Sequence, residues 1–207
     1  MKKSKKKLSI IIIITLIILL IIFIILSLLI KKEDKPLNDG EIKKVDVIDK
    51  YGYYLEDDAT SYYKSLFKEL KKIINEEEVN YEEYAKIVSK LFVTDVFNLD
   101  NKITSSDIGG LQFIYPLFKD DFIHINQNGL YSSVISNVYN DRKQELPIVK
   151  EVNIDSISET KFDYNDKEYD GYLVNVSIIY EKDLSYPTNY KLILIKENQY
   201  LYVAKGE

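Results

Sequence analysis

The chain has 207 residues, no cysteine and a formal net charge of −5 at pH 7. The absence of cysteine excludes disulfides, thiol nucleophiles, thiolate metal ligands and a lipid-modified cysteine. A nucleic-acid-binding protein usually carries a basic face, so the acidic balance argues against nucleic acid as a partner.

The N-terminal part of the chain is a long apolar block between two groups of lysines. No residue from Leu8 to Ile30 is charged. As a helix, this block would be roughly 35 Å long, which exceeds the hydrocarbon core of about 30 Å. It continues into Lys31 and Lys32 without the small-residue cleavage site of a signal peptide. We therefore predict that residues 8–30 form an uncleaved transmembrane helix in the lipid bilayer; the alternative is a buried helix of a soluble protein.

The orientation follows from the charges that flank this block. Residues 1–7 form a short tail whose only charged side chains are lysines, whereas the lysines after the block are mixed with Glu33 and Asp34. Short basic tails stay on the cytoplasmic side, and long domains are translocated largely regardless of their charge. We predict a single-pass protein of the cell membrane with a cytoplasmic N-terminus and an extracytoplasmic C-terminal domain.

Residues 31–50 are rich in charge and contain Pro36 and an Asn-Asp-Gly turn signal. This composition predicts a linker between the membrane and the fold. The remaining residues, 51–207, have the length of one domain with its own core.

Two amphipathic helices are expected first. One runs from Asp58, with Asp57 and Asp58 at its start, and the other begins at Asn80, where Asn80 and Glu83 form a variant of the capping box. The apolar face of the first helix consists of Tyr63, Leu66, Phe67, Leu70, Ile73 and Ile74. That of the second consists of Tyr84, Ile87, Val88, Leu91, Phe92 and Val96.

The next region has weaker helix signals. A start signal at residues 104–107 is followed by Gly109 and Gly110, which argue against a long helix. Pro116 is well placed in the first turn of another helix, with Phe118, Phe122 and Ile125 at helical spacing. Gly129 lies inside this helix or breaks it. Helices are expected to about residue 140.

After Pro147 the apolar residues alternate with polar ones, which predicts an antiparallel meander over residues 148–205. Turns are expected at Asn165-Asp166 and near Asn198. One face of the long strand should consist of Tyr172, Val174, Val176, Ile178 and Tyr180. The predicted fold class is α+β, with helices packed on one face of a curved sheet.

This order of elements resembles the cone-shaped α+β fold of the nuclear-transport-factor type. Among membrane-anchored proteins, it resembles the inner-membrane assembly components of type IV secretion and conjugation systems, which have a short inside tail, one membrane helix and such a domain outside. The resemblance covers nearly the whole chain but rests on architecture, so no functional residue is carried over by position. It implies a scaffolding role in an envelope assembly. Other members of the broad fold hold small-ligand pockets or act as isomerases, which implies the alternative function.

Asp95 is the one candidate ligand-binding residue. It lies four residues after Leu91 and seven after Val88, on the apolar face of the second helix, where a carboxylate must be paired or hydrogen-bonded. In a cone-shaped fold, such a group can contact a ligand or act as a general base between helix and sheet. The competing interpretation is that Asp95 bonds the backbone or the hydroxyls of the nearby residues 104–107.

The sequence contains no catalytic motif, and we expect no cofactor and no metal site. His124 is the only histidine and is expected at the surface beside Asp121. The Gly109-Gly110 pair is interpreted as a tight turn or a close approach between helix ends. The leading hypothesis is a membrane-tethered interaction module with protein partners in the envelope, and self-association is left open. The alternative is a ligand-binding or enzymatic pocket that uses Asp95.

Overall fold

The structure is a computed structural model, and it describes residues 43–207. The predicted tail, the transmembrane helix and most of the predicted linker lie outside the described residues. Within residues 43–207, no helix is long and apolar enough to cross a membrane.

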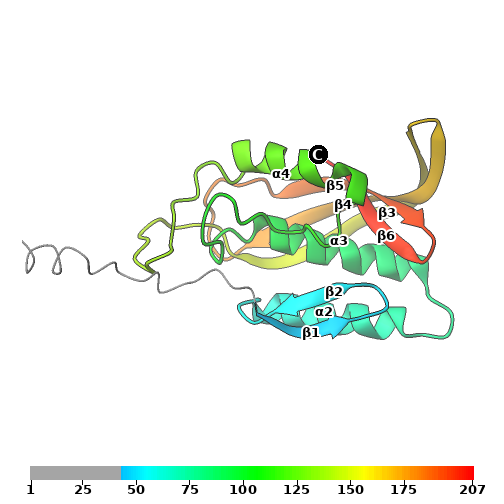
Figure 1. Ribbon diagram of the computed structural model, residues 1–207, viewed down its shortest axis with the longest axis horizontal. Helices are drawn as coiled ribbons and strands as arrows, with labels where there is room; N and C mark the ends of the chain where they lie inside the picture. Colours follow the sequence, from blue (N-terminus) through cyan, green and yellow to red (C-terminus); the bar gives the residue numbers. More distant parts are fainter. Residues whose placement is uncertain (1–42) are drawn as a thin grey trace, which may run out of the picture. The chain divides into compact units, whose positions relative to one another are not determined.

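The described residues form an α+β domain with three helices and a four-stranded antiparallel sheet, which confirms the predicted class (Figure 1). The elements, in chain order, are β1 (Lys44–Ile48), β2 (Tyr53–Glu56), α2 (Ser61–Ile74), α3 (Tyr81–Phe97), the 3-10 turn η1 (Pro116–Phe118), α4 (Lys119–Asn128), β3 (Val149–Tyr164), β4 (Lys167–Tyr180), β5 (Asn189–Glu197) and β6 (Tyr200–Gly206).

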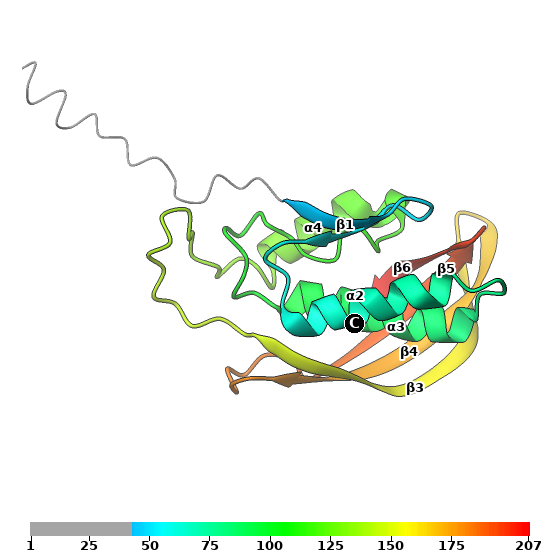
Figure 2. The ribbon, with the colours of Figure 1, turned by 90° about the horizontal axis from the view of Figure 1, so that it is seen from below.

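The main sheet has the strand order β3-β4-β5-β6, so the predicted meander is confirmed. Asn165 and Asp166 both adopt positive φ in the β3–β4 turn, and Asn198 does so in the β5–β6 turn, as tight hairpins require. Register irregularities in β3 and between β5 and β6 bend the strands. The sheet therefore curves around α2 and α3 (Figure 2).

α3 begins as the sequence predicts, whereas α2 begins at Ser61 and not at Asp58, so that neither Asp57 nor Asp58 lies in its first turn. Thr60 caps α2, and the Asn80 side chain accepts hydrogen bonds from the backbone amides of Glu82 and Glu83 at the start of α3. The reciprocal half of the capping box is replaced, because Glu83 forms an ion pair with Lys86 instead. The predicted apolar face of each helix is buried.

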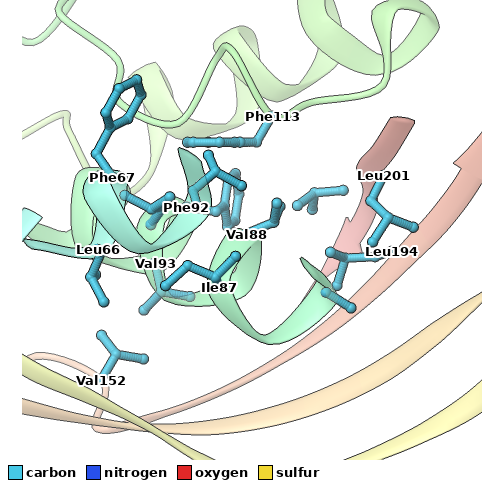
Figure 3. Packing of buried hydrophobic residues seen from close by; sticks show 14 of the residues in the cluster. Leu66, Phe67, Ile87, Val88, Phe92, Val93, Phe113, Val152, Leu194 and Leu201 are labelled. Carbon is cyan, nitrogen blue, oxygen red and sulfur yellow. The ribbon is translucent and has the colours of Figure 1, made fainter. Parts of the chain in front are cut away.

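The space between helices and sheet is filled by large side chains. Figure 3 shows Phe92, Val88 and Phe113 packed between the helices and Leu201 of β6. Two buried tyrosines cross this core, with the Tyr53 and Tyr84 hydroxyl oxygens 2.6 Å apart. The Leu201 carbonyl lies 3.3 Å from the Tyr53 hydroxyl as a further acceptor, so both buried hydroxyls have a hydrogen-bond partner.

The β1–β2 hairpin lies over the helices (Figure 2). Its turn reaches the main sheet at β6, where the Tyr200 hydroxyl donates to the Lys50 carbonyl at 3.3 Å. β1 falls inside residues 31–50, for which the sequence predicts a linker, so part of that range is folded. Ile48 is buried in the main core, and Asp46 forms an ion pair with Lys71 of α2. Charged residues alternate with Val45 and Val47 in β1, and a strand this short gives too little alternation to be distinguished from a linker.

The region between α3 and β3 differs most from expectation. Residues 104–107 form turns, and the helix that Pro116 opens is divided into η1 and α4. α4 ends at Asn128, with Gly129 as its C-cap, so the helices stop short of residue 140. Phe122 packs against the core, but Ile125 is 68% exposed. Helical spacing predicts Ile125 on a buried face, which is wrong because α4 buries none of its residues fully.

Candidate functional site

Asp95 lies in the last turns of α3, and both of its carboxylate oxygens are engaged. Oδ1 is 2.7 Å from Nζ of Lys102, and Oδ2 accepts a hydrogen bond of 2.6 Å from the backbone amide of Gly110. The side chain of Asp95 is 20% exposed, whereas that of Lys102 is only 4% exposed. The carboxylate therefore connects the helix to two points of the following loop.

Lys102 is the most deeply buried charge of this group. Burial by itself lowers the pKa of Lys102, but the charge of Asp95, with smaller contributions from Tyr131 and Asp107, outweighs it and holds this pKa above its ordinary value. The ammonium therefore stays charged at neutral pH. The loop around it is held by Arg142, whose Nη1 donates to the carbonyl of Lys102 at 2.7 Å.

The Gly109-Gly110 pair lies directly against α3. A Cβ on Gly109 would come within 2.2 Å of the carbonyl oxygen of Asp95, and Gly110 has a φ of +77°. The Tyr131 hydroxyl accepts from the Gly109 amide at 3.0 Å and donates to the Val96 carbonyl at 2.7 Å. The predicted close approach is thus present, with Tyr131 holding the loop to the helix.

A small polar cleft opens beside Asp95. Its lining comes from β2, the segment before α2, the start of α2, the end of α3 and the loop that follows, and it consists of Tyr54, Glu56, Asp58, Ala59, Thr60, Tyr63, Thr94, Asp95, Asn98, Asn101 and Gln112. The cavity volume is about 20 Å³, which is room for one or two water molecules.

Two groups in this cleft are not fully stabilised by their surroundings. Asn101 Oδ1 is buried and has no hydrogen-bond partner among the described residues. The pKa of Glu56 is raised to about 7, mainly because burial penalises its charged form and also because Asp95 lies nearby, while Lys102 opposes the shift. Both groups can accept a hydrogen bond from a donor in the cleft.

Gln112 closes one side of the cleft, where its side chain forms hydrogen bonds with the backbone of β2. Its Oε1 accepts from the Tyr54 amide at 2.9 Å, and its Nε2 donates to the Tyr54 carbonyl and to the Tyr63 hydroxyl at 3.2 and 3.1 Å. The sequence does not indicate Gln112, Tyr63 or Lys102 as site residues. The cleft takes several of its polar groups from loops, which show no periodicity that could indicate a shared site.

The structure thus places Asp95 outside the space between helix and sheet, because no residue of the main sheet lines the cleft. Besides Lys102, Asp95 bonds a backbone amide, as in the competing interpretation, but this amide belongs to Gly110 and not to residues 104–107. A role for Asp95 in ligand binding stays a prediction.

The histidine does not line this cleft. His124 is exposed on α4 and contacts Asn128. Among residues 43–207, no group of three or more histidine or acidic side chains is arranged to hold a metal ion.

Comparisons with protein-family models, with curated proteins and with solved structures found no match to this chain. The candidate site is therefore defined by its own geometry.

Proposed function

We propose that the chain is a single-pass, membrane-tethered interaction module of the cell envelope, whose α+β domain docks protein partners outside the cytoplasm. Residues 8–30 supply the tether in this proposal. The cone-shaped resemblance to secretion and conjugation components is part of the proposal and suggests the kind of assembly in which the module serves.

The observation that carries the proposal is the closed core. The interior is filled by buried aromatic and aliphatic side chains, including Phe92 and Phe113. The cleft at Asp95 holds about 20 Å³, far below the roughly 300–1,000 Å³ of typical small-molecule pockets. This packing favours function at the surface over function in an interior pocket.

Exposed apolar side chains supply candidate contacts. Leu117, Ile125, Ile135 and Tyr139 are all more than half exposed and follow one another in the segment from η1 to the loop after α4. Large apolar side chains at the surface are typical anchors of protein interfaces.

Crosslinking in cells tests the docking role. A photoreactive phenylalanine analogue at Leu117 or Ile125 of the full chain should give discrete crosslinked complexes on illumination of intact cells. The same analogue at the buried Phe113 is the control and should give none. The absence of crosslinks from all exposed positions would contradict the proposal.

Protease accessibility tests the orientation. Protease added to intact cells should degrade residues 43–207 and leave a short membrane-bound fragment. Digestion only after lysis would place the domain in the cytoplasm.

The alternative function is a site for a small hydrogen-bond donor at the cleft. It is favoured by Asn101 Oδ1, which is buried without a partner among the described residues. Methylammonium, as a probe, should raise the melting temperature of the unmodified chain but not that of Glu56→Gln. An equal effect on both proteins would exclude the cleft as its site.

A further inference from the structure

The outer edge of β3 is free over the second half of this long strand. β3 is an edge strand of the main sheet and pairs only with β4. Among the described residues, its edge is covered near its beginning, where Asn98 accepts from the Val149 amide and the Tyr62 hydroxyl bonds both backbone groups of Val152. Residues 157–163 of this edge form no hydrogen bond within residues 43–207 beyond those to β4.

The free edge belongs to an arm that extends beyond the rest of the sheet. β5 pairs with β4 only as far as Gly171, opposite Ile195. Residues 161–164 therefore continue with β4 alone, and the gold hairpin in Figure 1 extends past the other strands. An exposed strand edge of this kind is a template for pairing with another chain.

The direction of the backbone groups can be derived from the hairpin turn. The turn has two residues, so the flanking Tyr164 and Lys167 form a hydrogen-bonded pair. Every second residue back along β3 repeats this pairing, and Thr160 therefore directs its backbone groups toward β4. The residues of β3 that alternate with these hydrogen-bonded ones direct their backbone groups outward, to the free edge. They are Ile157, Glu159, Lys161 and Asp163.

We propose that this edge pairs with the same edge of a second copy of the chain, in antiparallel orientation about a twofold axis at Thr160. Glu159 of each copy then lies directly opposite Lys161 of the other. Both side chains are exposed, and opposite charges at facing positions stabilise a strand pair. A protective edge usually carries charges that repel a second strand, whereas here the two charges are complementary about the axis.

Lys161 can form this contact without losing its partner in its own copy. Its ammonium forms an ion pair with Glu168 on the neighbouring β4. A lysine ammonium has three donors, so donors remain for the carboxylate of Glu159 from the second copy.

The same register matches the backbone groups. Glu159 and Lys161 of the two copies exchange N–H···O=C hydrogen bonds, because both direct their backbone groups outward. Ile157 and Asp163 form the next such pair. Thr160 of one copy then faces Thr160 of the other in a non-hydrogen-bonded pair, where the side chains come closest. This dimer would join two four-stranded sheets into one, and the inference does not depend on the membrane tether.

The absence of cysteine from the natural chain makes the first test direct. In the full-length Thr160→Cys variant, solubilised in mild detergent, oxidation should join the two copies by a disulfide. Ser158→Cys is the matched control on the same strand. In the proposed register the two copies of this cysteine are offset by four residues, about 13 Å, beyond the reach of a disulfide. Equal crosslinking of both variants, or none of Thr160→Cys, would overturn the proposal, and the latter result would leave the edge to a different partner.

Charge reversal provides a second test that does not depend on the disulfide position alone. In the Thr160→Cys background, Glu159→Lys alone or Lys161→Glu alone places like charges opposite each other and should reduce homodimer crosslinking about tenfold. A mixture of the two variants, distinguished by tags of different size, places the introduced lysine of one copy opposite the introduced glutamate of the other and should crosslink as the heterodimer. If mixing restores nothing, the proposed register is wrong.

Discussion

Lys102 and Asp95 form an ion pair whose lysine is almost completely buried, with 2.7 Å between Nζ and Oδ1. The pair joins the end of α3 to the loop that carries the glycine pair. Its importance for folding lies in the cost of an unpaired charge, since removal of one partner from a buried pair typically costs about 3–5 kcal/mol.

Removal of either partner should therefore destabilise the domain, and the loss of stability should differ between the two partners. Asp95→Asn leaves the buried ammonium of Lys102 without its counter-charge and should cost about 3–5 kcal/mol. Lys102→Met should cost less, because the remaining carboxylate is partly exposed and keeps the Gly110 amide. Urea unfolding of both variants and of the double variant measures this. The double variant should be more stable than the sum of the single effects predicts, and additive effects would show that the two side chains do not interact.

Loss of the Tyr131 hydroxyl should leave two buried backbone groups without a partner. Tyr131→Phe removes the acceptor for the Gly109 amide and the donor to the Val96 carbonyl. We expect a loss of about 1–3 kcal/mol in the free energy of unfolding. Tyr139→Phe is the control, because Tyr139 is exposed, and it should change stability by less than about 0.5 kcal/mol.

The helices and the meander could be predicted from the sequence because their signals are local and repeated. Leu66 and Val88 lie at helical spacing within their stripes, and Val174 and Val176 alternate with polar neighbours, so each residue supports the assignment of the next. The cleft could not be predicted in this way. Lys102 lies in a loop, and its pairing with Asp95 depends on the path by which this loop folds back onto α3. The spacing of residues in the sequence does not predict that path.

Stability should depend on pH through Glu56. The pKa of this carboxyl is raised to about 7 in the folded domain, against an ordinary value of 4.5. Between these values the folded state holds a proton that the unfolded state has released, so stability decreases as pH rises. The contribution is full below about pH 4.5 and is lost as pH rises through about 7.

Comparison of variants isolates this effect from the other carboxylates. From pH 5 to pH 8, the unmodified protein should lose about 1–2 kcal/mol more than Glu56→Gln, less than the full shift implies because solvent screens a partly exposed group. The free energy of unfolding at each pH measures the difference. An identical slope for Glu56→Gln would contradict the assignment.

Alanine substitutions at two glycines distinguish the cost of backbone strain from the cost of steric crowding. Gly52 and Gly110 both have positive φ, but a Cβ on Gly52 would meet open space, whereas one on Gly110 would lie 2.8 Å from Phe92 and Val96. Gly52→Ala should cost about 1–2 kcal/mol, the strain of a left-handed residue. Gly110→Ala adds overpacking of about 1–3 kcal/mol. Thermal unfolding of both variants tests the order, and equal losses would show that the side chains move aside freely.

The boundary of the folded domain gives the last prediction. The sequence places the start of the domain at residue 51, but Ile48 of β1 is 5% exposed and Asp46 is paired with Lys71. A chain of residues 43–207 should unfold cooperatively and show mixed α and β circular dichroism, because its core closes through the two long helices, the main sheet and the β1–β2 hairpin. A chain of residues 51–207 should be less stable by about 1.5–3 kcal/mol or more, since burial of Ile48 alone contributes that much. Equal stability of the two chains would show that β1 does not contribute to the folded domain and belongs to the linker. Aggregation of both chains would mean that the domain needs a partner or the preceding residues to fold.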